Sequence, residues 1–83
     1  MEDARQTVTR FIYQNFYVAD GQQIGGAESL LERGIIDSTG VLEVSGFLEE
    51  RFGITVDDSD MLPENLDTID GIVAFVARKT VER

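Results

Sequence analysis

The chain has 83 residues, of which 42% are hydrophobic, and this size and composition predict one globular domain over residues 1–83. It has no Cys and no His, which excludes a disulfide framework, a zinc–thiolate site and a self-contained Ser-His-Asp hydrolase. No apolar run approaches the ~20 residues of a membrane-spanning helix, and the acidic start of the chain is unlike a signal peptide. We therefore expect a cytoplasmic protein without a membrane span.

The formal net charge is −9, from 16 acidic and 7 basic residues, and it is unevenly distributed. Ten of the acidic residues lie between Asp37 and Asp70, where Arg51 is the one basic residue. This balance argues against nucleic-acid binding. A negative field on one half of the chain suits docking onto basic surfaces of other proteins, although a face that only aids solubility has the same composition.

The first predicted helix covers residues 3–17, with Asp3 at the positive end of its dipole. Its apolar side chains recur at the helical spacing i, i+3, i+4 and i+8: Val8, Phe11, Ile12 and Phe16. The glycine-containing stretch 19–27 shows no strand alternation and is predicted to be a loop. Residues 29–32 (Ser-Leu-Leu-Glu) then resemble a capping box, and Gly34 is placed to end a short helical turn.

The second predicted helix covers residues 38–52 and ends at Gly53. Four apolar residues form its core stripe: Val41, Val44, Leu48 and Phe52. Leu42 lies about 200° around the helix from Val44, so it is predicted to face water. The other residues on or beside this exposed face are Thr39, Glu43, Gly46, Glu49 and Glu50. An apolar residue ringed by carboxylates suits a small docking surface, whereas one exposed Leu alone needs no explanation.

Two glycines in this helix also call for a reason. Gly40 and Gly46 each cost roughly 0.8–1 kcal/mol relative to Ala in a helix interior. Close approach of another backbone, from the preceding loop or from a partner, is one explanation. For Gly40 the alternative is a place in the fraying first turn, where the cost is smaller.

The remaining chain is predicted to be helical except for residues 54–56 (Ile-Thr-Val), which are extended but have no partner strand. A short helical turn is expected around residues 58–62, broken by Pro63. The last helix should begin near Asp67, with an apolar stripe of Ile69, Ile72, Val73 and Val76. The expected fold is therefore an all-α bundle with three main helices and one short helix.

The stretch 34–43, Gly-Ile-Ile-Asp-Ser-Thr-Gly-Val-Leu-Glu, contains the strongest candidate for a chemical site. Asp37 and Ser38 are both favoured residues for capping the start of a helix, and a cap alone would explain them. If Asp37 is the cap, Ser38 has an exposed hydroxyl at the positive end of a helix. That position suits a phosphodiester, because the helix terminus favours an anion.

On these residues the chain resembles the acyl carrier protein family, including its peptidyl and aminoacyl carrier relatives. The resemblance covers roughly residues 4–80. Its most specific parts are Asp37-Ser38 after an aliphatic pair, the Glu-Glu-x-Phe-Gly-Ile turn at residues 49–54, and Leu-Pro-Glu-Asn-Leu-Asp-Thr-Ile at residues 62–69. The resemblance implies a four-helix bundle that is a carrier domain and not an enzyme.

The resemblance also implies a cofactor and partners. Ser38 matches the family's serine, which holds 4′-phosphopantetheine through a phosphodiester, with Asp37 beside it. A phosphopantetheinyl transferase installs the group, a ligase loads an acyl or aminoacyl thioester, and a downstream acyl transferase or synthase receives it. Contact with these partners is expected from Thr39, Leu42, Glu43, Gly46, Glu49 and Glu50, with the chain a monomer.

Departures from the family pattern narrow the expected role. Thr39, Gly40 and Gly46 replace the residues usual in fatty-acid carriers, which makes the docking face smaller and favours a specialised biosynthetic pathway. A calcium-binding loop opening at Asp57 is excluded, since its sixth and twelfth positions are Leu62 and Thr68 rather than Gly and Glu. The alternative that stays open is an unmodified acidic helical interaction domain.

Overall fold

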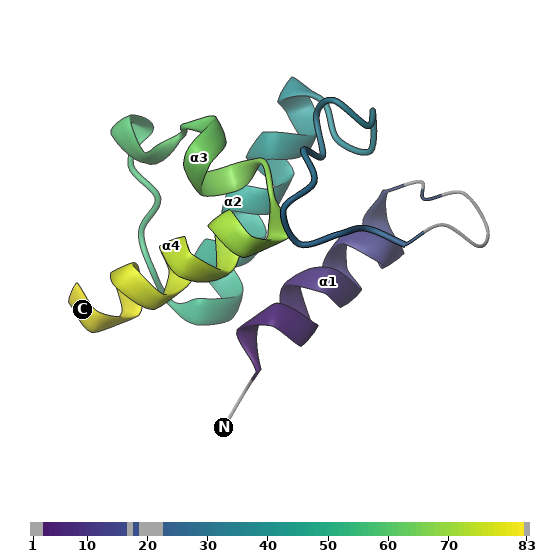
Figure 1. The fold of residues 1–83 in the computed structure, drawn as a ribbon. Helices are drawn as coiled ribbons and strands as arrows, with labels where there is room; N and C mark the ends of the chain where they lie inside the picture. The colour runs from purple at the N-terminus through teal and green to yellow at the C-terminus, as the bar shows by residue number, and fades with distance from the viewer. Residues whose placement is uncertain (1–2, 17, 19–22, 83) are drawn as a thin grey trace.

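The computed structural model describes residues 3–16, 18 and 23–82, and in these ranges the chain is helical, with no strand. Its elements in chain order are α1 (Ala4–Asn15), α2 (Ser38–Phe52), the 3₁₀ turn η1 (Asp58–Asp60), α3 (Pro63–Leu66) and α4 (Ile69–Glu82), as Figure 1 shows. Three long helices and one short one confirm the all-α bundle predicted from the periodicity. Residues 54–56 are extended without forming a strand, also as predicted.

Helix α1 begins and ends close to its predicted limits. The Asp3 side chain accepts hydrogen bonds from the backbone N–H groups of Arg5 and Gln6, so Asp3 is the N-cap. The helix ends at Asn15, and position 17 of the predicted helix lies outside the described residues. Within the predicted stripe, Val8 and Ile12 are fully buried, whereas the two Phe residues are half-buried at the edge of the core.

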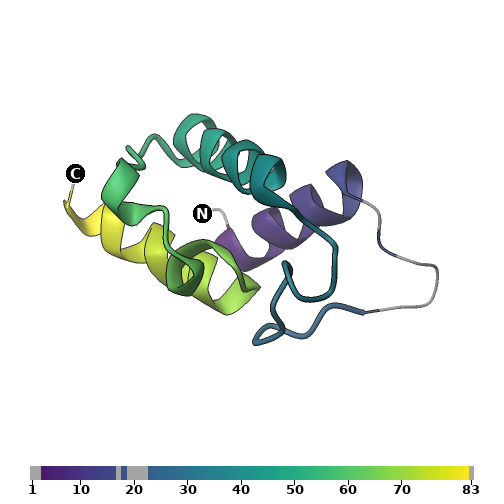
Figure 2. The same cartoon turned by 90° about the horizontal axis from the view of Figure 1, so that it is seen from above.

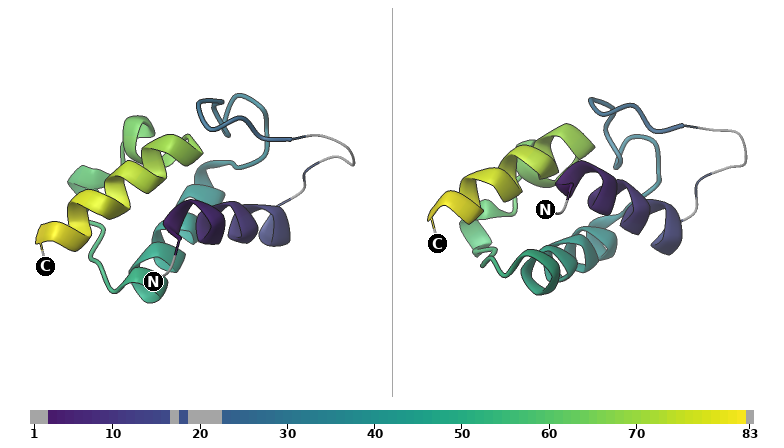
Figure 3. Two further views of the ribbon diagram at one scale, coloured as in Figure 1. Left: turned by 60° about the horizontal axis from the view of Figure 1, so that its bottom comes forward. Right: turned by 90° about the horizontal axis from the view of Figure 1, so that it is seen from below.

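The core lies where the long helices meet. Helix α1 runs beside α4, and an ion pair of 2.6 Å between Arg5 and Asp70 links their N-terminal ends. Figures 2 and 3 show α2 on the other side of the bundle from α4, with α1 passing between their ends. The buried hydrophobic residues are Val8, Ile12, Leu30, Ile36, Val44, Leu48, Ile54, Leu66, Ile69, Ile72, Phe75 and Val76. Of these, Phe75 was absent from the predicted stripe of the last helix.

The connection from α2 to α4 differs from the prediction at one point. Pro63 does not break a helical turn; it begins α3, where a missing N–H and a fixed φ fit the first helical position. The turn before it is the separate η1. Asn65 in α3 is buried, donating to the carbonyl of Asp60 and accepting from Arg78, each at 2.9 Å. These bonds hold the short α3 between η1 and α4.

Helix α4 starts two residues later than predicted, at Ile69. The hydroxyl of Thr68 accepts a hydrogen bond of 2.9 Å from the N–H of Gly71, which is the geometry of an N-cap. Ile72 and Val76 from the predicted stripe are buried, and Val73 is half-buried. Helix α2, earlier in the chain, ends at Gly53 as predicted. Gly53 adopts the left-handed conformation, with φ of 67°, which ends a helix.

Candidate functional site

The segment that leads into α2 is held in place by Asp67, which lies between α3 and α4. The carboxylate of Asp67 accepts hydrogen bonds from the Ser29 hydroxyl and, at 2.8 Å, from the N–H of Leu31. Its backbone carbonyl accepts from the N–H of Leu30, also at 2.8 Å. The capping-box prediction is right in part, since the N–H of Glu32 donates to the Ser29 hydroxyl, but these residues form turns and no helix. Sequence reasoning missed the role of Asp67.

This anchored segment positions the start of α2. Ile36 is 4% exposed and packs in the core, whereas the next residue, Asp37, is exposed. Asp37 is the N-cap, and its carboxylate accepts a hydrogen bond of 2.8 Å from the N–H of Gly40. Ser38 is therefore the first residue of a 15-residue helix, and its side chain is exposed. Because Asp37 makes the cap, the Ser38 hydroxyl is not needed for it.

Gly40 lies in the first turn of α2, as one of the two explanations expected, but it is buried there. A Cβ at Gly40 would lie 3.0 Å from Cε1 of Phe16 and 3.1 Å from Cβ of Ile36. The atoms nearest to this Cβ belong to side chains, so the expected close approach of another backbone is not found at Gly40. Gly40 lets the end of α1 and the segment before α2 pack directly on the first turn of α2.

The exposed face of α2 carries the residues predicted to contact partners. Ser38, Thr39, Leu42, Glu43, Gly46, Glu49 and Glu50 are all exposed, and we call them the outer face of α2. Leu42 is 61% exposed, as its angle around the helix predicts. A Cβ at Gly46 would meet no described atom within 4 Å outside its own helix backbone. The outer face thus has an exposed apolar residue beside an open, flat position.

Glu49 differs from the other two glutamates of this face. Its carboxylate accepts a hydrogen bond of 2.9 Å from the N–H of Val56, which ties the end of α2 to the extended segment after it. Glu43 and Glu50 make no ion pair within the described chain. Reversing the charge of Glu49 would therefore disturb the fold as well as the surface, whereas Glu43 and Glu50 are cleaner probes of the surface charge.

A small apolar cleft lies between α2 and α3. It has a volume of about 100 Å³ and is lined by Leu31, Val41, Met61, Leu62, Pro63, Leu66 and Asp67. Val41 lies on α2 less than one turn from Ser38, and the exposed edges of the cleft are Leu31 and Leu62. No sequence pattern indicates this cleft, because its lining comes from three separate segments.

Part of the acidic half is neutralised by Lys79, which comes from outside it. The Lys79 ammonium lies 2.8 Å from Asp60 and 3.5 Å from Asp57. The hydrogen bond to Lys79 lowers the pKa of Asp60, helped by the backbone N–H of Asp57, and the Asp60 carboxylate raises the pKa of Lys79. Lys79 therefore offsets part of the negative charge around η1.

Comparison with known proteins identifies the kind of protein. No protein-family model matches the chain. The D-alanyl carrier protein of Streptococcus suis (strain 98HAH33) is 34% identical over 74 residues, which are 89% of this chain and 91% of that protein. The chain belongs to the acyl carrier protein family. Carrier proteins are not catalysts, so this carrier protein is not an enzyme.

The carrier family agrees with the geometry at the start of α2. The similarity extends over most of the chain, and its helical bundle is of the carrier type. Among the described residues of this carrier, no helix combines the length and apolarity needed to cross a membrane. A carrier role also implies enzymes that load and unload it.

Proposed function

We propose that Ser38 holds 4′-phosphopantetheine through a phosphodiester, and that the chain delivers an acyl or aminoacyl group between partner enzymes of a specialised biosynthetic pathway. The observation that carries this proposal is the exposed Ser38 hydroxyl, located at the first position of α2 and left out of the cap by Asp37. Family membership supports it, since the chain resembles carriers of this kind over most of its length.

The residues around Ser38 fit a phosphodiester. The N-terminal end of the 15-residue α2 favours a negative charge through its unpaired N–H groups and its dipole. The carboxylate of Asp37 is held on the N–H of Gly40, so it has a fixed position beside the serine. When bound, the group supplies a thiol on a flexible arm, on which a cargo is held as a thioester. Because the chain has no His or Cys, a separate transferase must install the group from coenzyme A.

The outer face of α2 is proposed to contact the transferase, the loading ligase and a downstream acyl transferase or synthase in turn. Leu42 supplies a small apolar centre, and Glu43 and Glu50 supply a field that steers basic surfaces toward it. Gly46 keeps the surface flat next to Leu42. Such a small contact is weak enough to release between enzymes. We propose that the carrier is a cytoplasmic monomer that forms one domain.

The cargo is proposed to be short. The cleft of about 100 Å³ between α2 and α3 is far smaller than the roughly 300–1,000 Å³ of pockets for drug-sized ligands. A long acyl chain would not fit in it. Because a relative is named as a D-alanyl carrier protein, D-alanine is the first cargo to test.

The test is modification in vitro. The chain is incubated with coenzyme A and a broad-specificity phosphopantetheinyl transferase, and its intact mass and the labelled peptide are measured. We expect one phosphopantetheinyl group on Ser38 and none on Ser38→Ala. Ser59→Ala is the matched control, since Ser59 is also exposed and lies in η1. No mass increase would favour the unmodified interaction domain, and a label on another serine would contradict the assignment.

A further inference from the structure

One wall of the cleft between α2 and α3, which we call the α2–α3 cleft, is held in place by Asp67. Leu31 borders the cleft and is 39% exposed. Its N–H donates a hydrogen bond of 2.8 Å to Oδ1 of Asp67. The preceding residue, Leu30, is fully buried, and its N–H donates to the backbone carbonyl of Asp67, also at 2.8 Å. These two hydrogen bonds fix the backbone that carries the Leu31 side chain.

Asp67 is also tied to the wall that α3 contributes. Its N–H donates a hydrogen bond of 2.9 Å to the carbonyl of Pro63, which makes Asp67 the C-cap of α3. Pro63 and the preceding residue, Leu62, line the cleft, and so does Asp67 itself. One residue therefore sets the separation between Leu31 and the start of α3.

The carboxylate of Asp67 makes a larger share of this link than a neutral side chain would. It accepts a further hydrogen bond from the Ser29 hydroxyl, so both of its oxygens hold the segment before α2. Hydrogen bonds to an ionised group are roughly twice as strong as those between neutral groups. The backbone bond from Leu30 and the burial of Leu30 do not depend on this side chain. We therefore expect the segment to stay docked when the carboxylate is removed.

We propose that Asp67 is a positioning residue that limits the length of an acyl cargo, because it holds Leu31 in place as a wall of the α2–α3 cleft. This inference rests on the proposed carrier function. The cleft of about 100 Å³ has room for roughly three groups the size of a water molecule. It admits the first carbons of an acyl chain, and the fixed Leu31 wall stops the rest. Asp67 acts on the cargo through Leu31 rather than by direct contact.

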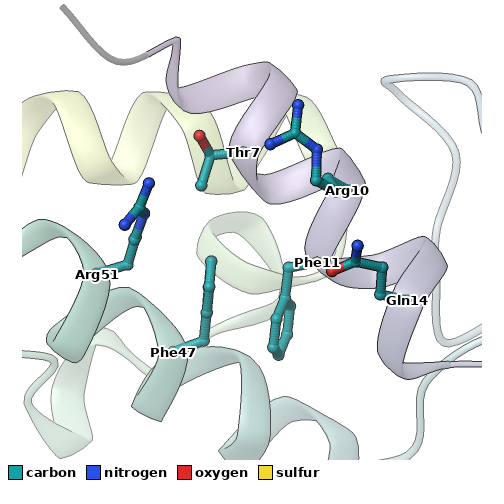
Figure 4. A pocket seen from close by; sticks show the side chains of 6 residues that line it. All are labelled: Thr7, Arg10, Phe11, Gln14, Phe47 and Arg51. Carbon is teal, nitrogen blue, oxygen red and sulfur yellow. The ribbon is translucent and has the colours of Figure 1, made fainter.

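The hollow between α1 and α2 is the rival place for a longer chain. Its volume is about 220 Å³, and Figure 4 shows the side chains that line it: Thr7, Arg10, Phe11, Gln14, Phe47 and Arg51. Four of these six side chains are polar, so an acyl chain there would remove polar groups from water. Phe47 follows Ser38 by nine residues, which places it half a turn around α2 and about 13.5 Å along it. Val41 of the α2–α3 cleft is nearer, less than one turn from Ser38.

The first arm of the test uses the unmodified chain with 1-hexanol as a free probe, and it measures binding by methyl and amide chemical shifts. We expect the wild type to bind 1-hexanol weakly. Asp67→Ala should bind it at least about fourfold more tightly, with shifts centred on Val41 and Leu66, because one further buried methylene is worth about that factor. Leu31→Ala removes the wall itself and should have the same effect. Asp67→Asn keeps one acceptor oxygen and should bind with intermediate affinity.

The matched control is Asp70→Ala. It removes a carboxylate three residues away, together with the ion pair to Arg5, but Asp70 does not border the cleft. It should leave the affinity for 1-hexanol unchanged. The double variant of Asp67→Ala and Leu31→Ala tests whether Asp67 acts through Leu31. Its gain in affinity should be about that of one single variant, whereas a general loosening of the fold would give the product of both gains.

The second arm uses the loaded carrier. A broad-specificity transferase places acetyl- or octanoyl-phosphopantetheine on Ser38 from the corresponding acyl-coenzyme A, and cleavage by hydroxylamine reports how far each thioester is sheltered. Rates are compared with those of the free acyl-coenzyme A. We expect no shelter for either wild-type form. In Asp67→Ala and Leu31→Ala, the octanoyl form alone should be cleaved more slowly, with chemical shifts centred on Val41.

Three results would overturn the inference: a wild type that shelters octanoyl as well as the variants do, no gain in either variant, or an equal gain in Asp70→Ala. Octanoyl-induced shifts centred on Phe47 would also overturn it, in favour of the hollow between α1 and α2. Each of these leaves the carrier proposal intact, because none concerns the loading of Ser38. A failure to load Ser38 would contradict the carrier proposal, and with it the assignment of the cleft to a cargo, whatever 1-hexanol shows.

Discussion

The inner and outer sides of α2 each contain a glycine, and the surroundings of the two are opposite. Gly40 is buried, and a Cβ there would crowd Phe16 and Ile36. Gly46 is exposed, and a Cβ there would meet nothing described within 4 Å outside its own helix backbone. The fold therefore requires the first glycine and not the second. Both glycines lower the helix propensity of α2. Gly40 allows close packing on the inner side, and Gly46 leaves a flat surface beside Leu42 on the outer side.

The largest effect on the outer side is expected from Leu42→Ala. Removing an exposed apolar contact should lower the rate of loading by the ligase about tenfold, as for an interface residue worth about 1.4 kcal/mol. Stability should change by less than about 0.5 kcal/mol, because Leu42 is 61% exposed. Loading rates and thermal unfolding check this pair of results. A variant that unfolds more easily but loads normally would place Leu42 in the core instead.

The two glycines should respond in opposite directions to alanine. Gly40→Ala should lower the free energy of unfolding by about 1 kcal/mol, since overpacking of roughly 1–3 kcal/mol exceeds a gain in helix propensity of about 1 kcal/mol. Gly46→Ala should raise it by about 0.5–1 kcal/mol, because only the propensity changes. Urea unfolding of both variants measures the difference. If both stabilised the chain, the packing around Gly40 would be looser than described.

The charge of the outer side should act mainly on the rate of association. Glu43→Lys and Glu50→Lys should each slow loading a few-fold at low salt and converge with the wild-type rate as salt rises, because exposed charges are screened over ~8 Å at physiological ionic strength. Loading rate against ionic strength is the measurement. Glu49→Lys is the contrasting variant, since it also loses the hydrogen bond to Val56 and should be less stable. If the wild-type loading rate did not depend on salt, the acidic surface would aid solubility and would not steer partner enzymes.

The smallest effect is expected away from α2, at the pair of Asp60 and Lys79. The pKa of Asp60 is lowered in the folded chain, so its ionised form stabilises the fold above its unfolded pKa. That contribution is lost as the pH falls through the lowered value. Asp60→Asn should therefore be slightly less stable than the wild type at neutral pH, with a difference that shrinks in acid. Asp58→Asn, at an exposed neighbour in η1 without an ion pair in the described chain, should show no such convergence.

Local patterns predicted what local interactions determine. The cap at Asp37, the exposure of Leu42 and the end of α2 at Gly53 follow from helical spacing and from terminal residues, and the structure agrees with each. Pro63 was misread because the same residue that stops one helix also suits the start of the next.

What sequence reasoning missed depends on contacts between distant segments. Asp67 holds the segment before α2 through bonds to residues 36 and 38 positions away, and no local pattern signals such a bond. The cleft between α2 and α3 likewise draws its lining from separate segments. Phe11 was predicted as core, but it is only half-buried, and its ring stacks on Phe47 of α2, which no predicted stripe contained.

The most direct test of the carrier proposal is the intact mass of the chain isolated from its own host, with any thioester preserved, followed by mapping of the modified residue. We predict the mass of the chain plus one phosphopantetheinyl group, in part with a short acyl or aminoacyl group added, and both carried on Ser38. Treatment with neutral hydroxylamine should remove the cargo and leave the phosphopantetheinyl group in place. A chain that is unmodified throughout, or modified on a serine other than Ser38, would contradict the account.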